Sequence, residues 1–168
     1  MLSMLAKLLK ALNSEAQPGQ IALAMALALV VALTPTFSLH NVLIVLLAFV
    51  LRTNLSAFFV AFAGFSAIAW FADPYLAGLG EQLLTHAALQ ETWTALYQND
   101  FWRMTAFNHT LVLGGLVVGV LAFVPVLLLS RWLVVQYRER LLAWVNRLRI
   151  AQLLKGTKFY RIYQSLAE

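Results

Sequence analysis

The stretch that decides the fold runs from Pro18 to Phe71 and reads PGQIALAMALALVVALTPTFSLHNVLIVLLAFVLRTNLSAFFVAFAGFSAIAWF. Arg52 is its only charged residue, and two short polar breaks interrupt it, at residues 34–41 and 51–55. A helix on the surface of a soluble domain keeps one polar face, and no such face can be drawn through these residues. The sequence therefore predicts that this part of the chain is surrounded by lipid.

The composition of the whole chain points the same way. Of its 168 residues, 62% are hydrophobic and 11% are charged, whereas about 25% are charged in ordinary soluble domains. The absence of cysteine excludes disulfides, thiolate zinc sites and a cysteine nucleophile. The net charge of +5 comes from basic residues that flank the apolar runs. We interpret it as contact with the anionic headgroups of a phospholipid bilayer and expect no nucleic-acid partner.

Four apolar segments are expected, at residues 18–34, 37–51, 55–72 and 110–130. About 20 helical residues cross a bilayer core, so the first two segments are short. They fit either two thin or tilted spans or one re-entrant hairpin around Pro35, and in both cases Pro18 and Arg52 lie on the same side. The expected fold is an all-α membrane protein with a transmembrane domain over residues 14–130.

Further segments surround these four. Leucines recur on one side of residues 1–13, which predicts an amphipathic helix on the membrane surface or docked on the protein itself. Asp73-Pro74 is expected to end the third segment. Residues 73–109 then form an external segment, with a short amphipathic helix over Glu91–Tyr97. Residues 131–168 are expected to form a basic, amphipathic tail.

The basic residues predict the orientation. With a cytoplasmic N-terminus, every Lys and Arg except Arg103 lies on the cytoplasmic side, and the acidic residues of the external segment lie outside. This distribution follows the positive-inside rule. We therefore expect a multi-pass protein with both termini in the cytoplasm.

Small residues at four-residue spacing are candidate helix-packing positions, because packing drives helix association in lipid. They are Ala24, Ala28 and Ala32 in the first segment, and Gly115 and Gly119 in the fourth. Packing among the helices of this chain is the simpler interpretation, and contact with a partner or a second copy is the alternative.

Polar residues near the outer ends of the segments form a candidate cluster. They are His40, Asn41, Asp73, Asn108 and His109. Two imidazoles and a carboxylate at similar depth could bind a metal or relay a proton. The alternative is that these side chains meet water at the membrane interface, and we assign no metal and no cofactor.

Pro35, Arg52 and Asn54 form a second candidate set, which marks the turns of the first hairpin. Asn54 is suited to cap the third segment. Arg52 either reaches headgroups at the cytoplasmic end or contacts a lipid phosphate or a partner carboxylate.

Sequence motifs of common enzymes are missing. The chain has no Gly-rich phosphate loop, no His-Glu-x-x-His and no Gly-x-Ser-x-Gly. No carboxylate lies within an expected span, which argues against an ion-driven pump. The sequence thus predicts a protein that is not an enzyme.

The two breaks and Asp73-Pro74 resemble a family of small bacterial inner-membrane proteins described as a domain of unknown function. The family pattern is Pro-x-Pro-x-Gln, then Leu-Arg-x-Asn-Leu, then Asn-Pro. Pro35, Arg52 and Asn54 match it, whereas Phe37 replaces the second proline and Asp73 the asparagine. The resemblance implies a bacterial cytoplasmic membrane and no established activity.

Two functional hypotheses follow. The first is a subunit that anchors or assembles with a larger membrane or periplasmic protein of the envelope, in one version a protein that handles lipids. The second is a component of an oligomeric transporter or channel, with the break at Pro35 lining a polar passage. An enzyme acting on lipids through His40, Asp73 and His109 is the least favoured reading.

Overall fold

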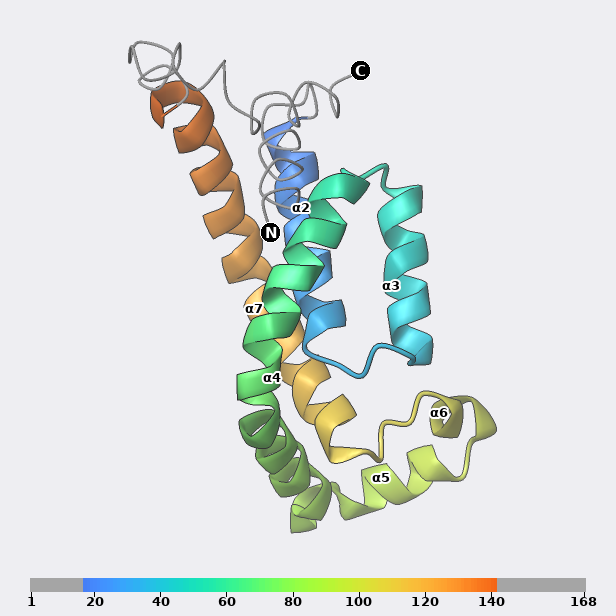
Figure 1. The fold of residues 1–168 in the computed structure, drawn as a ribbon. Helices are drawn as coiled ribbons and strands as arrows, with labels where there is room; N and C mark the ends of the chain where they lie inside the picture. Colours follow the sequence, from blue (N-terminus) through green and yellow to red (C-terminus); the bar gives the residue numbers. More distant parts are fainter. Residues whose placement is uncertain (1–16, 142–168) are drawn as a thin grey trace.

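The computed structural model describes residues 17–141, and this part is built from helices (Figure 1). In chain order these are α2 (Pro18–Ala32), α3 (Leu39–Val50), α4 (Leu55–Thr85), the 3₁₀ turn η1 (Ala87–Leu89), α5 (Gln90–Tyr97), α6 (Asp100–Met104), α7 (Thr110–Gln136) and the π-helical turn η2 (Tyr137–Leu141). The all-α class is confirmed for the described part. The expected helix over residues 1–13 and most of the expected tail lie outside the described residues.

Helices α2, α4 and α7 pack together as the core, with α2 and α4 running one way and α7 the other (Figure 1). Helix α2 is apolar on every side and is correspondingly buried on every side. Ile21, Ala22, Ala24, Ala26 and Ala28 have no exposed surface. The short alanine side chains allow α4 and α7 to approach the α2 backbone closely.

Glycines bring α7 against the ends of both other core helices. A Cβ atom on Gly115 would overlap the carbonyl oxygen of Leu33 in the turn after α2, and one on Gly114 would overlap the carbonyl oxygen of Leu76 in α4. At Gly119 a Cβ atom would lie 3.3 Å from the Cα of Val30. The first turns of α7 therefore rest on the α2 and α4 backbones, and Gly114 and Gly115 leave no room there for a larger residue.

Helix α4 does not end at Asp73-Pro74, so the expected boundary at residue 72 is wrong. The helix continues through Pro74 to Thr85. A proline inside a helix removes one hydrogen bond and crowds the preceding turn, at a cost of about 3 kcal/mol. Here Ala69 and Leu76, on either side of Pro74, belong to one buried cluster with Leu29 and Leu33 of the α2 end. Packing on both sides of the proline outweighs the local preference to stop.

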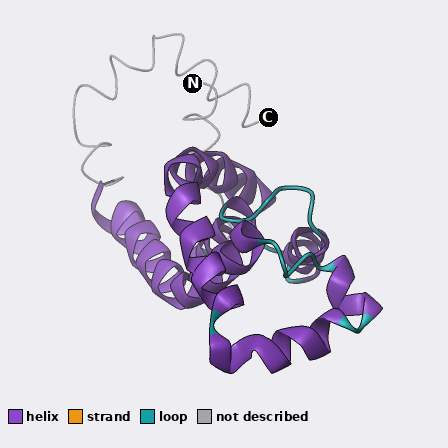
Figure 2. Ribbon diagram, turned by 90° about the horizontal axis from the view of Figure 1, so that it is seen from below, coloured by secondary structure: helices purple, strands orange, loops and turns teal. Residues whose placement is uncertain are grey.

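The chain between α4 and α7 forms an arm of short helices beside the core (Figure 2). Its α5 helix, Gln90–Tyr97, confirms the helix expected over Glu91–Tyr97. The indole N–H of Trp93 donates to the carbonyl oxygen of Leu83 at 2.9 Å. The side-chain amide of Gln90 donates to the carbonyl oxygen of Leu84 at 2.7 Å. These bonds satisfy carbonyl groups that a helix end leaves open, and they fix the arm to α4.

Two helical runs in the described part are long and apolar enough to cross a membrane. They are Leu55–Thr85 and Thr110–Arg140, each of 31 residues. Helices α2 and α3 are equally apolar but have 15 and 12 residues. In both long runs only 22% of the most apolar window is buried inside the protein. The helices of a soluble core are mostly buried, so the exposed apolar faces of these two are typical of helices in a membrane.

Candidate functional site

The break between α2 and α3 is closed by a buried pair of polar side chains. The Asn41 amide nitrogen donates to the carbonyl oxygens of Pro35 at 2.9 Å and Val31 at 3.4 Å. The Thr34 hydroxyl lies 3.0 Å from the Asn41 side-chain oxygen, to which it donates, and 3.2 Å from the carbonyl oxygen of Val30. Thr34 and Asn41 are 6% and 2% exposed. Asn41 thus satisfies the Val31 carbonyl group near the end of α2 and the Pro35 carbonyl group in the turn.

A second, more exposed chain of polar contacts follows on the same turn. The Ser38 hydroxyl donates to the Pro35 carbonyl oxygen at 2.6 Å and lies 3.0 Å from His40 Nε2. Because the Ser38 proton is used on Pro35, Ser38 accepts from Nε2–H of His40, and His40 Nδ1 is left as an acceptor. Within the described residues, Nδ1 is buried without a hydrogen-bond partner.

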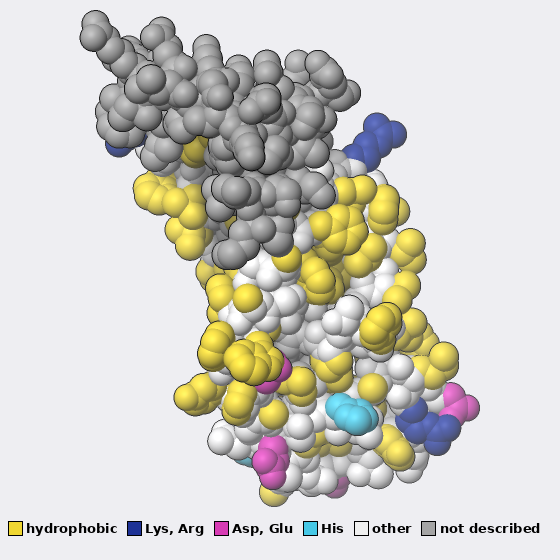
Figure 3. Space-filling model, viewed as in Figure 1, with side chains coloured by type: hydrophobic (Ala, Val, Ile, Leu, Met, Phe, Trp, Pro, Cys, Tyr) yellow, Lys and Arg dark blue, Asp and Glu magenta, His cyan; other side chains and the backbone are white. Residues whose placement is uncertain are grey.

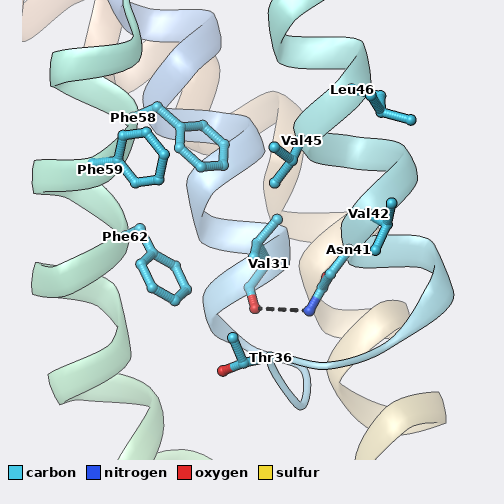
Figure 4. Close-up of a pocket in the computed structure, with 9 residues that line it drawn as sticks. All are labelled: Val31, Thr36, Asn41, Val42, Val45, Leu46, Phe58, Phe59 and Phe62. Atoms are coloured by element: carbon cyan, nitrogen blue, oxygen red, sulfur yellow. Dashed lines mark hydrogen bonds between the residues drawn. The ribbon is translucent and has the colours of Figure 1, made fainter.

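An apolar pocket of about 300 Å³ opens between α3 and the pair α2 and α4 (Figure 4). Val42, Val45 and Leu46 line it from α3, and Phe58, Phe59 and Phe62 line it from α4. Val31 of α2 lies behind, and Asn41 and Thr36 lie at the end near the break. Apart from Asn41 and Ala48, no side chain of α3 is buried, so α3 stands away from α4 along this gap.

The far end of α3 is closed by a tight turn into α4. Arg52 adopts a left-handed conformation, with φ of 51°. Its N–H donates to the Phe49 carbonyl oxygen at 3.0 Å, and the N–H of Thr53 donates to that of Ala48 at 3.1 Å. This is the Schellman pattern that ends a helix. One residue later, the Asn54 side chain accepts from the N–H of Ala57 at 2.9 Å and caps α4.

Substitutions at Arg52 test whether the guanidinium group or the left-handed backbone conformation matters more for stability at this position. We expect Arg52→Gly to raise the free energy of unfolding by up to about 1 kcal/mol, because glycine adopts positive φ without strain. Arg52→Ala keeps the strain and gains nothing. Thermal unfolding of both variants in one detergent measures the difference. If both variants lose stability equally, the guanidinium and not the turn sets the importance of residue 52.

The structure does not support a metal site at the candidate histidine–aspartate cluster, and its role as a proton site stays a hypothesis. No group of three His, Cys, Asp or Glu side chains in residues 17–141 is placed to hold a metal ion. Asp73 lies inside α4 and not at its end. His109 lines a pocket of about 210 Å³ with Pro35 and Ser38, whereas Asn108 lines a separate one with Trp93. Of the five candidates, only Asn41 lies in a buried hydrogen-bonded site.

The small residues named from the sequence lie at contacts within the chain. Ala24, Ala28 and Ala32 are no more than 9% exposed, and Gly115 and Gly119 lie against Leu33 and Val30. The sequence reasoning did not single out Thr34 as the partner of Asn41, the pocket phenylalanines, or the close contacts of Gly80 and Gly114. Thr34 beside Pro35 carried a signal, since a hydroxyl next to a helix break is placed to satisfy open carbonyl groups.

Comparison with known proteins gives the family. Residues 3–142 match the family model described as an uncharacterized protein conserved in bacteria, DUF2062. The chain belongs to this family. It is also 32% identical over 156 residues, 93% of its length, to an uncharacterized protein of Treponema pallidum (strain Nichols), 96% of which the match covers. No solved structure matches it.

Membership of DUF2062 confirms the resemblance drawn from the two breaks. The structure gives those residues in this chain a physical role. Arg52 and Asn54 end one helix and begin the next, and the Pro35 carbonyl accepts from both Ser38 and Asn41. The family adds a bacterial setting to the apolar helices and no activity.

Proposed function

We propose that this DUF2062 protein is a multi-pass subunit of the bacterial cytoplasmic membrane that assembles with a larger envelope protein through its external arm, residues 86–109. The outward faces of the core support the membrane setting. In Figure 3 hydrophobic side chains cover the middle of the described surface. Those most exposed on α4 and α7 include Ile68, Trp70, Phe71, Leu121 and Leu128, which are at least 60% exposed.

Charge supports the orientation. Val134 of α7 packs in one cluster with Ile21 and Ala57, so the end of α7 lies beside the start of α2 and α4. Arg52, Arg131, Arg138 and Arg140 belong to this end, whereas Glu81, Glu91 and Asp100 belong to the opposite end with the arm. The positive-inside rule puts the arginine-rich end in the cytoplasm, and both termini with it.

The exposed hydrophobic side chains of the arm carry the assembly proposal. Phe101 is 58%, Met104 70% and Trp102 43% exposed. Met104 lines a pocket with Pro35 and Val112, so this part of the arm lies where α2 ends and α7 begins. Tyrosine and tryptophan are common at headgroup depth, but Phe101 and Met104 have no polar atom suited to that position. Hydrophobic groups exposed together mark surfaces that meet a protein or a membrane, and we assign this patch to a protein partner. The Trp93 bond to α4 holds the arm in place for such a partner.

Photo-crosslinking in living cells tests the proposal. A photoreactive amino acid at Phe101 is expected to give an adduct with one larger protein. The same group at Thr92, exposed on α5 and polar, serves as the matched control and is expected to give none. Adducts with lipid alone would contradict assembly through the arm. Adducts between two copies of this 18.8 kDa chain alone would also contradict it, and would favour an oligomeric passage.

A further inference from the structure

We propose that the pocket between α3, α2 and α4 binds one fatty-acyl chain of a phospholipid. Its volume of about 300 Å³ lies at the lower end of the range for ligand pockets. Figure 4 shows Val45 of α3 and Phe58, Phe59 and Phe62 of α4 directed toward the space between the two helices. The site is thus an open groove between two helices and not a single exposed face.

The chemistry of the lining selects an apolar occupant. Asn41 is the polar side chain nearest the interior, and both of its donor contacts go to the carbonyl oxygens of Pro35 and Val31. Its oxygen accepts from Thr34. With these groups already paired, Thr36 at the end near the break is the remaining polar side chain of the lining. The part between α3 and the α4 phenylalanines offers no hydrogen bonds to a headgroup, a sugar or an ion. A hydrocarbon chain can enter without leaving a hydrogen bond unmade, because it has no polar atoms.

The shape of the lining disfavours a helix from a partner protein. Helices associate in lipid where small residues let their backbones approach, and the small residues Ala57 and Ala61 of α4 are already buried within the chain. The pocket is lined instead by branched and aromatic side chains. A helix with side chains is about 10 Å across, whereas a single acyl chain can bend between such side chains.

The gap is held open at both ends. At one end Asn41 bonds α3 to the turn after α2. At the other end the Arg52 turn and the Asn54 cap join α3 to α4. Between them Ala48 is the only apolar side chain that α3 buries. Because both ends are fixed, α3 cannot close onto α4 without breaking these bonds, and the pocket is formed before its ligand arrives.

The route into the pocket runs sideways from the bilayer. Leu46 and Phe59, which line the pocket, are 54% and 55% exposed on the outer surface. The pocket is therefore continuous with the hydrophobic surface that the proposed membrane setting places in lipid. The inference rests on that setting but not on a protein partner, so a missing crosslink at Phe101 would leave it intact.

Labelling in vesicles tests the site. The full chain is reconstituted in phosphatidylethanolamine and phosphatidylglycerol vesicles with a trace of phospholipid carrying a diazirine on its acyl chain, and adducts are mapped by mass spectrometry. We expect adducts concentrated on peptides containing residues 42–46 and 58–62. Val45→Trp fills the pocket and should lower these adducts about tenfold. Leu43→Trp, which introduces the same side chain at an exposed α3 residue outside the lining, should leave them unchanged.

Equal labelling in Val45→Trp and Leu43→Trp would overturn the proposal, since it would mean that the probe reports general contact with the bilayer. Adducts spread evenly over the outer faces of α4 and α7 would overturn it as well. Thermal unfolding checks that Val45→Trp is folded. If it is not, Leu46→Trp blocks the same pocket from its mouth, and Val45→Ala, which leaves room, should keep full labelling.

Discussion

Gly115→Ala is expected to destabilise the folded bundle by about 3 kcal/mol or more. The added Cβ atom would overlap the Leu33 carbonyl oxygen, which belongs to the backbone and cannot move away as a side chain can. The variant can fold only if α7 moves away from the turn after α2, and this would also separate Gly114 from Leu76. We expect a large fall in the thermal midpoint in detergent and little protein in the membrane.

The same substitution at Gly64 provides a control of opposite sign. Gly64 is exposed in α4 and has no atom within 4 Å of the position of a Cβ. Alanine is favoured over glycine in a helix by about 1 kcal/mol, so Gly64→Ala should stabilise the protein. A second pair on α4 repeats the contrast, because Gly78 has open space whereas a Cβ on Gly80 would overlap the Thr110 carbonyl oxygen. Equal effects at Gly115 and Gly64 would show that α7 does not pack as described.

Asn41→Leu is expected to cost about 2–3 kcal/mol, because it leaves the Pro35 carbonyl oxygen and the Thr34 hydroxyl with fewer partners in a buried site. Thr34→Val removes the donor to Asn41 and should cost about 1 kcal/mol. Since the two side chains bond to each other, the double variant should lose less stability than the sum of the single losses.

A double-mutant cycle, measured by thermal or denaturant unfolding in one detergent, gives this coupling. Ser38→Ala is the matched control. Its hydroxyl also donates to the Pro35 carbonyl oxygen, but at a more exposed position, so we expect a loss below about 0.5 kcal/mol. Additive losses for Thr34→Val and Asn41→Leu would contradict the shared hydrogen bond and, with it, the account of how the break is closed.

Local signals predicted some of these elements well. The Leu51–Leu55 break marks the end of α3 and the start of α4, because a turn residue and an asparagine cap act over a few residues. Asp73-Pro74 led to a wrong helix boundary because it too is a local signal, which acts over a few residues. The sequence around Pro74 favours a stop, whereas Ala69 and Leu76 are buried with residues far away in the chain, which supports the helix on both sides of the proline.

The candidate site was only partly predictable. Asn41 could be named as a polar residue beside a break, but its pairing with Thr34 depends on the angle at which α3 turns back. The pocket follows from the distance between α3 and α4, and no pattern in either helix specifies that distance. Similar expected depth did not bring His40, Asp73 and His109 together as metal ligands, because depth alone does not place side chains side by side.

Cysteine labelling of intact cells tests most directly whether the chain crosses the membrane with its arm outside. The natural chain has no cysteine, so Ser56→Cys at the start of α4 and Thr92→Cys in the arm each introduce a single thiol at an exposed position. A membrane-impermeant maleimide with access to the periplasm is expected to label Thr92→Cys in intact cells and Ser56→Cys only after the inner membrane is broken. Equal labelling of both in intact cells, or recovery of the protein in solution without detergent, would contradict the membrane topology.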